Sequence, residues 1–154
     1  MQRRTFLKGS LASSAVAVAV GAGLLTPSAV LAAWPKAAFS AKNVQDAMTG
    51  VFGSADSAPS DDIKIKAPDI AENGAVVPVS VKTGMSGVSD ISIIAEKNGT
   101  PLAANFVLGS TAKGFVSTRI KMSKTSNVIA VVKAGGKLYS ARKEVKVTIG
   151  GCGG

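Results

Sequence analysis

ISIIAEKNGTPLAANFVL, residues 91–108, carries the pattern that decides the fold class. Apolar side chains recur at every second position on both sides of a central Asn98-Gly99 pair. A period of two places one set of side chains on one face of a β-strand, and Asn-Gly is a strong signal for a hairpin turn. The stretch therefore predicts two antiparallel strands. Their apolar positions are Ile91, Ile93 and Ala95 before the turn and Leu102, Ala104, Phe106 and Leu108 after it.

The same alternation continues on both sides of this hairpin, in short runs separated by turn residues. Asn73-Gly74 and Gly135-Gly136 mark two of the turns. About seven short strands with turns at regular spacing predict an all-β domain, an antiparallel β-sandwich of immunoglobulin-like type. The other runs that we interpret as strands are residues 63–66, 76–82, 115–122, 128–132, 138–142 and 144–149.

Two of these runs also indicate where their strands lie in a sheet. Residues 128–132 are apolar at every position, so their strand is either central and buried on both faces or turned toward a partner. We favour the central position. Pro78 has no N–H to donate to a neighbouring strand, so its run is expected at an edge or at a bulge.

The segment before the strands predicts one short helix at the N-terminus of the domain. Ser40 is placed to cap this helix, residues 41–49 form it, and Gly50 is expected to end it. Residues 54–62 are rich in Ser, Asp and Pro and predict a loop. The expected apolar stripe of the helix consists of Val44, Ala47 and Met48.

The first 32 residues predict a twin-arginine signal peptide. Arg3-Arg4 precedes an apolar run over residues 11–25, and a small-residue cleavage site follows at residues 30–33. The run is too short and too rich in Ala and Gly for a membrane anchor. We therefore expect export to the periplasm, a β-sandwich domain over residues 33–149, and no membrane anchor.

The charge of the chain favours anionic partners. Lys and Arg outnumber Asp and Glu by 18 to 9, which gives a net charge of +9. Removing the signal, with Arg3, Arg4, Lys8 and no acid, leaves +6 for the mature chain. Only seven aromatic residues occur (one Trp, one Tyr and five Phe), so the basic and aromatic pattern of a nucleic-acid binder is missing. Small anions or an acidic protein surface fit better.

The residues available for chemistry exclude most catalytic sites. The chain has no His, which excludes Ser-His-Asp and Cys-His catalysis and His-ligated metals. A single Cys builds neither a zinc nor an iron–sulfur site. The adjacent carboxylates Asp61-Asp62 lie in the Ser-rich loop and fit a solvated turn. We therefore predict no catalytic residue and no metal site.

The chain ends in a segment that concentrates its remaining chemistry. Residues 150–154 place the only thiol, that of Cys152, two residues from the C-terminus. Glycine-rich tails resist ordering, so we expect a mobile arm that reaches about 17 Å when extended. Small neighbours would allow the thiol into a narrow channel of another protein. The expected arm consists of Gly150, Gly151, Cys152, Gly153 and Gly154.

The thiol of Cys152 has no activating group nearby in the sequence. The C-terminal carboxylate of Gly154 is expected to raise its pKa, and the arm carries neither a Lys nor a helix N-terminus to lower it. A partner's site would therefore have to activate the sulfur. These features indicate a carrier that holds cargo on Cys152 and is not itself an enzyme.

The signal, the all-β domain and the ending VKVTIGGCGG, residues 145–154, together resemble the SoxY family of the thiosulfate-oxidising Sox system. The resemblance implies that Cys152 is the covalent carrier cysteine. It also implies a SoxZ-like partner subunit, exported with this chain, and no bound cofactor. Three enzymes would act on the cysteine: SoxAX, a haem enzyme, joins thiosulfate to it; SoxB, a manganese-dependent hydrolase, releases sulfate; SoxCD, a sulfane dehydrogenase, oxidises the remaining sulfur.

Two other functions are compatible with a lone exposed thiol. An exported structural or adhesion sandwich would use Cys152 for a disulfide-linked dimer. An autonomous thiol oxidoreductase would need a resolving cysteine or a base, and the sequence has no second cysteine and no histidine.

Overall fold

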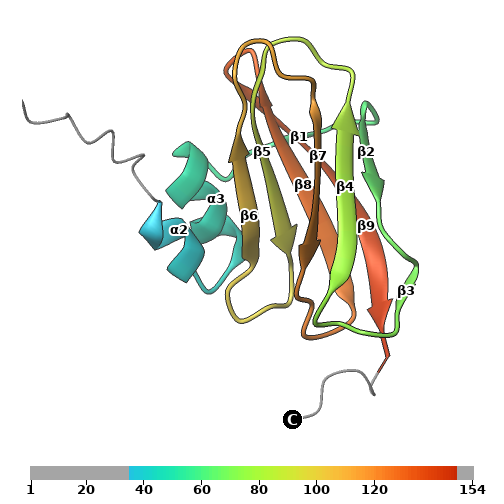
Figure 1. Ribbon diagram of the computed structural model, residues 1–154. Helices are drawn as coiled ribbons and strands as arrows, with labels where there is room; N and C mark the ends of the chain where they lie inside the picture. Colours follow the sequence, from blue (N-terminus) through green and yellow to red (C-terminus); the bar gives the residue numbers. More distant parts are fainter. Residues whose placement is uncertain (1–34, 149–154) are drawn as a thin grey trace, which may run out of the picture. The chain divides into compact units, whose positions relative to one another are not determined.

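Two β-sheets pack face to face, and two short helices lie beside β6 (Figure 1). The computed structural model describes residues 35–148. Within this range the helices are α2 (Lys36–Ser40) and α3 (Val44–Phe52). The strands are β1 (Ala58–Pro59), β2 (Ile63–Lys66), β3 (Ile70–Ala71), β4 (Val77–Thr83), β5 (Val88–Ala95), β6 (Leu102–Val107), β7 (Phe115–Ile120), β8 (Ser126–Ala134) and β9 (Lys137–Val147).

The larger sheet has the strand order β1-β9-β8-β5-β6, and β3 also pairs with β9. The smaller sheet has the order β2-β4-β7. All neighbours are antiparallel except the two-residue strands β1 and β3, which run parallel to β9 at separate positions along it. The predicted all-β sandwich is therefore confirmed. The sequence pattern missed β1 and β3, and it divided β9 into two runs.

The hairpin that decides the fold class is present, but its turn differs from the prediction. Strands β5 and β6 pair antiparallel and are joined by residues 96–101, a longer connection than a tight two-residue turn. The Asn98 side chain has a different use. Its Nδ2 donates to the Lys121 carbonyl at 2.7 Å, and its Oδ1 accepts from the Ser123 N–H at 2.9 Å. Asn98 thus fastens the β5–β6 connection to the segment after β7.

The second glycine turn forms as predicted. Gly135 and Gly136 adopt φ values of 56° and 77° between β8 and β9. Both values lie in the left-handed region that glycine adopts without steric cost, as a two-residue hairpin of this type requires.

Strand β8 is central, as predicted from its unbroken apolar run. It pairs with β5 on one side and β9 on the other. Val128, Ala130 and Val132 point into the core between the sheets, whereas Ile129 and Val131 pack beneath the helices. Because both faces are covered, both sets of residues are apolar.

The predicted helix is wrong in its limits. Two helices form instead of one, and Asn43 caps α3 by accepting from the Asp46 N–H at 2.8 Å. The helix ends at Gly53, which is left-handed with φ 75°. Gly50 lies inside α3, where a Cβ would come within 2.8 Å of Ala38 in α2. Gly50 therefore serves the close packing of the two helices and does not end one. Of the expected stripe, Ala47 and Met48 are buried and Val44 is partly buried.

The prediction for Pro78 is also corrected. Strand β4 is the middle strand of its sheet, not an edge. The Thr83 N–H donates toward β7, to the Gly114 carbonyl, so by alternation along the strand the nitrogen of Pro78 points to the β2 side. Pairing with β2 ends at Lys66↔Ser80. The missing N–H of Pro78 thus falls beyond the last pair, where no donor is needed.

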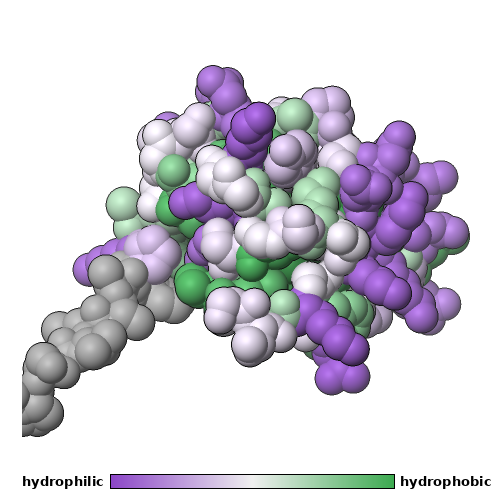
Figure 2. Space-filling view, turned by 90° about the horizontal axis from the view of Figure 1, so that it is seen from above, coloured by the Kyte–Doolittle hydropathy of each residue, from purple (hydrophilic) through white to green (hydrophobic). Residues whose placement is uncertain are grey.

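The apolar core has two parts, one between the sheets and one between the larger sheet and the helices. Viewed from its upper end, the domain shows apolar residues in the middle and hydrophilic residues along the side of β2 (Figure 2). Neither described helix is long and apolar enough to cross a membrane.

Candidate functional site

The predicted cargo site lies outside the residues that the structure describes. This applies to Cys152 and to all four glycines of the predicted arm, as well as to the predicted signal over residues 1–32. The structure does describe the segment from which the arm continues, because β9 ends at Val147 and Thr148 follows it. We call Val147 and Thr148, with the residues that bond them, the anchor.

One edge of the anchor is bonded to β3 and to the residue before it. The Lys146 N–H donates to the Asp69 carbonyl at 2.9 Å, and the Thr148 N–H donates to the Ala71 carbonyl at 3.2 Å. The Thr148 hydroxyl lies 3.5 Å from the same Ala71 oxygen. Strand β3 and Asp69 thus fix the last residues of the β9 backbone.

Thr125 bonds the opposite edge of the anchor. The backbone pairing between β8 and β9 ends at Ser126↔Val145. Beyond it, the Val147 N–H donates to the Thr125 Oγ1 at 2.9 Å, and this hydroxyl donates to the Val147 carbonyl at 3.4 Å. One threonine side chain therefore replaces the next backbone pair, and Val147 is held on the side that β3 does not reach.

A close backbone contact supports the anchor from the side of the smaller sheet. A Cβ on Gly74 would lie 2.5 Å from the Met122 carbonyl oxygen and 2.8 Å from Val147 Cγ1. Gly74 also accepts from the Met122 N–H at 2.7 Å. The sequence marked Gly74 as a turn, and the turn is present, but its contact with β9 could not be read from the pattern. No sequence signal pointed to Thr125 or Ala71.

Lys143 ties β9 to the segment between β2 and β3. Its Nζ donates to the Ala67 carbonyl at 2.6 Å and lies 3.1 Å from the Asp69 carboxylate. The Asp69 side chain is 90% exposed, so the pair adds little to stability. It holds the segment that enters β3, and so it helps to position the strand on which the anchor rests.

Two surface hollows lie at opposite ends of the sandwich. The larger, about 1130 Å³, is formed by the β4–β5 and β6–β7 connections, and Met85, Leu108 and Phe115 line it. It lies at the end of β4 away from the anchor.

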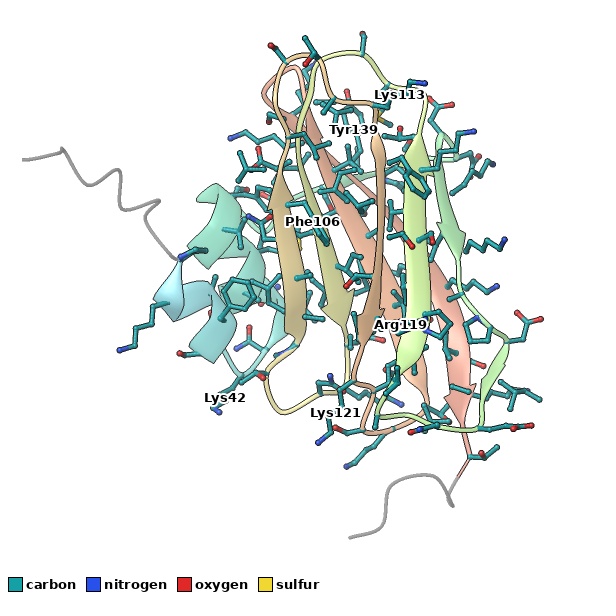
Figure 3. The ribbon with its side chains drawn as sticks, in the orientation of Figure 1. Lys42, Phe106, Lys113, Arg119, Lys121 and Tyr139 are labelled. Carbon is teal, nitrogen blue, oxygen red and sulfur yellow. The ribbon has the colours of Figure 1, made fainter. Side chains whose placement is uncertain are left out.

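The smaller hollow, about 520 Å³, lies at the anchor end of β7. Its lining includes Lys42, Arg119 and Lys121 and no carboxylate. These three cations are labelled toward the lower end of the sandwich in Figure 3. Over residues 35–148, no three His, Cys, Asp or Glu side chains gather where they could hold a metal ion.

Comparisons with known proteins agree on one family. Residues 48–152 match the family model described as sulfur oxidation protein SoxY, and this range includes Cys152. The solved structure of the sulfur carrier protein SoxY from Chlorobium limicola f thiosulfatophilum is 51% identical. That match covers 68% of this chain and 94% of the other, with a TM-score of 0.62.

More distant matches indicate the fold alone. A superoxide reductase (neelaredoxin) from Ignicoccus hospitalis is 22% identical, with a TM-score of 0.50 over 56% of this chain and 79% of its own. No curated protein sequence matches the chain.

Proposed function

This chain belongs to the SoxY family of sulfur oxidation proteins, and on that premise we propose that it carries intermediates of thiosulfate oxidation covalently on Cys152. One observation carries the proposal. The family match extends through residue 152, and Cys152 is the only cysteine in the chain. We place the carrier in the periplasm, exported by the twin-arginine route, because the chain opens with Arg3-Arg4 ahead of an apolar run.

The proposed loading step forms a sulfur–sulfur bond. The thiol of Cys152 loses its proton, and its sulfur bonds to the sulfane sulfur of thiosulfate. The two electrons released pass to a haem enzyme of SoxAX type, so that the thiol and thiosulfate are oxidised and the haem enzyme is reduced. Hydrolysis by a SoxB-type enzyme then adds water across the bond to the sulfonate, releasing sulfate and leaving a persulfide on Cys152. A SoxCD-type dehydrogenase oxidises that persulfide sulfur to a sulfonate: the dehydrogenase takes up the electrons, water supplies the oxygen atoms, and protons are released.

The anchor suits this role because it fixes where residues 149–152, which we call the cargo segment, begin. Cys152 follows Thr148 by four residues, so its Cα lies within about 14 Å of the anchor. Hydrogen bonds from β3 and Thr125 hold the last residues of β9 on both edges. The anchor therefore keeps its position in the sandwich when an enzyme binds Cys152, and the cargo segment extends from that fixed position.

The chain supplies attachment, and the partner enzymes supply activation. Residues 147–151, which directly precede Cys152, include no Lys, Arg or His that would favour the thiolate form that reacts. An enzyme site with positive charge would supply that preference when Cys152 enters it. A SoxZ-like subunit is proposed as the permanent partner, on the resemblance to the family.

The test is the intact mass of the mature protein, purified from the periplasm of cells grown on thiosulfate, before and after reductant. We expect reductant-labile additions of sulfur or thiosulfate that map to Cys152 and are absent in Cys152→Ser. We also expect Cys152→Ser to abolish thiosulfate-dependent turnover while circular dichroism shows an intact fold. A bare thiol, or only a disulfide-linked dimer, would contradict the carrier function and favour the structural alternative.

A further inference from the structure

The outer face of the smaller sheet is strongly basic. Alternation along β2, β4 and β7 turns the buried residues inward and leaves the others facing solvent. We call the solvent-facing set the basic face, because four of its members are cations and none is an acid. It consists of Lys64, Lys66, Pro78, Ser80, Lys82, Phe115, Ser117 and Arg119.

None of the four cations on this face forms an ion pair among the described residues. The one ion pair among residues 35–148 joins Lys143 to Asp69 and involves none of them. Lys64 and Lys82 are directly opposite in the register of β2 and β4. Like charges in that arrangement oppose strand pairing. The four cations are therefore exposed to solvent without an ion-pair partner. The repulsion between Lys64 and Lys82 lowers the stability of the smaller sheet.

The two outer faces of the sandwich differ in cover and in charge. Helices α2 and α3 pack over Ile129 and Val131 on the outside of the larger sheet. The exposed residues of β9 combine the acid Glu144 with cations, so their charge is of mixed sign. The described residues place no helix over the basic face. In Figure 3 it turns toward the viewer, with Arg119 labelled on β7. This uncovered face, whose charged residues are all cations, is therefore a candidate surface for binding an anionic partner.

We propose that the basic face is a transient docking surface for the enzymes that load and unload Cys152, and that these enzymes present acidic surfaces to it. This inference rests on the proposed function. Uniform charge of this kind speeds encounter with an oppositely charged partner and sets its orientation. A permanent subunit interface is more apolar, whereas the basic face has one large exposed hydrophobic residue, Phe115, at 53% exposure.

The composition of the face argues against other occupants. A second copy of the chain would bring like charges together. Single-stranded nucleic acid is bound by stacking aromatic residues along a basic groove, and Phe115 is the one aromatic residue on the face. Nucleic acid and an anionic membrane remain as outcomes that the test distinguishes.

The basic face reaches the end of the sandwich where the anchor lies. Gly74, which precedes β4, lies close against Val147 and accepts from the N–H of Met122, which follows β7. Pro78 and Arg119 are opposite each other near that same end. An enzyme seated on this part of the face would therefore have the start of the cargo segment beside it. Lys42 and Lys121 extend the positive charge around the end of the sheet.

The test compares two triple variants of the mature chain, each with any subunit that co-purifies with it. The first is Lys64→Gln, Lys82→Gln and Arg119→Gln. The matched control removes three exposed cations elsewhere, by Lys36→Gln, Lys97→Gln and Lys137→Gln, so both variants have the same net charge. The SoxAX-type enzyme of the same organism is the probe, and kcat/KM for loading Cys152 is measured at about 10 mM and about 500 mM salt, where screening is weak and strong.

The expected result is a loss of about tenfold in kcat/KM at low salt for the basic-face variant, which nearly disappears at high salt. The control should stay within about twofold of the parent chain. Equal losses in the two variants, or none in either, would overturn the proposal. Loss of the co-purifying subunit from the basic-face variant alone would also overturn it, because the face would then be a permanent interface.

Direct binding separates this inference from the carrier function. The same substitutions are introduced into a Cys152→Ser chain, which cannot be loaded, and affinity for the enzyme is measured at low salt. Weaker binding through the basic face supports docking even if no adduct ever forms on Cys152. Parallel titrations use single-stranded DNA and phosphatidylglycerol vesicles. If the substitutions abolish binding to either polyanion and leave enzyme affinity unchanged, the docking proposal is wrong.

Discussion

At the scale of single residues, the described part of the site depends on a few side chains and one glycine. Thr125 supplies both a donor and an acceptor to Val147, and Gly74 leaves room for the Met122 carbonyl. Neither residue takes part in a proposed chemical step. Their contribution is positional, because they determine where β9 stops and the cargo segment starts.

Replacing Thr125 with Val should loosen the anchor without unfolding the sandwich. Valine keeps the shape of the side chain but loses the hydroxyl that bonds Val147. Because this site is exposed, water replaces part of the bond, and we expect a cost of about 1 kcal/mol. Hydrogen exchange should therefore show faster exchange of the Val147 amide, by about fivefold.

Thr125→Ser is the matched control for this experiment, since it restores the hydroxyl. Its Val147 amide should exchange at nearly the parent rate. If Thr125→Val leaves that amide as protected as in the parent chain, then the β3 side alone holds the anchor.

At the scale of elements, the two sheets differ in what their outer faces do. Strand β8 covers a core on each side, whereas β2, β4 and β7 cover a core on one side and present cations on the other. The opposition of Lys64 and Lys82 is a local weakness in the smaller sheet.

Reversing one of those charges should strengthen the sheet. Lys64→Glu converts a repulsive cross-strand pair into an attractive one with Lys82, and we expect a gain of about 0.2–1 kcal/mol in the free energy of unfolding. Denaturant titration measures it. Lys97→Glu makes the same change of net charge at a residue in the β5–β6 connection, which lies outside the paired strands. If both variants shift stability equally, net charge is the cause and the cross-strand pair is not.

The elements also show how far the sequence predicts this fold. Alternation and glycine turns are local signals, and they predicted the main strands, the β8–β9 turn and the central place of β8 from residues 128–132. The strands β1 and β3 depend on pairing with distant β9, and no pattern in two residues reveals such a partner. Gly50 misled for the same reason, because its role is contact with Ala38 in another helix.

The residues of the candidate site likewise fall into those that the local sequence reveals and those that only long-range contacts reveal. Cys152 was identified by its uniqueness and its glycine neighbours, both visible in the sequence, and its role stays a prediction because it lies outside the described residues. Thr125 and Ala71 act through hydrogen bonds to a strand remote in sequence. Only a structure places them at the anchor.

At the scale of the whole molecule, the proposed function requires that the chain reach the periplasm. Arg3→Lys with Arg4→Lys should retain the full-length precursor in the cytoplasm, because the export route recognises the arginine pair and lysine does not reproduce its planar hydrogen-bonding group. Cell fractionation followed by mass spectrometry measures the distribution. Lys8→Arg, which conserves charge outside the pair, should be exported normally. Periplasmic accumulation of the double variant would contradict the twin-arginine assignment.

The placement of β1 and β3 along β9 limits self-association of the protein. Open strand edges invite β-sheet extension between molecules and, at high concentration, aggregation. On β9, β1 covers the edge at Tyr139 and Ser140, and β3 covers it at Lys146 and Val147. Between them, Lys143 reaches across to Ala67. Strand β9 is thus shielded from intermolecular strand addition, which is left to the outer edges of β6, β2 and β7.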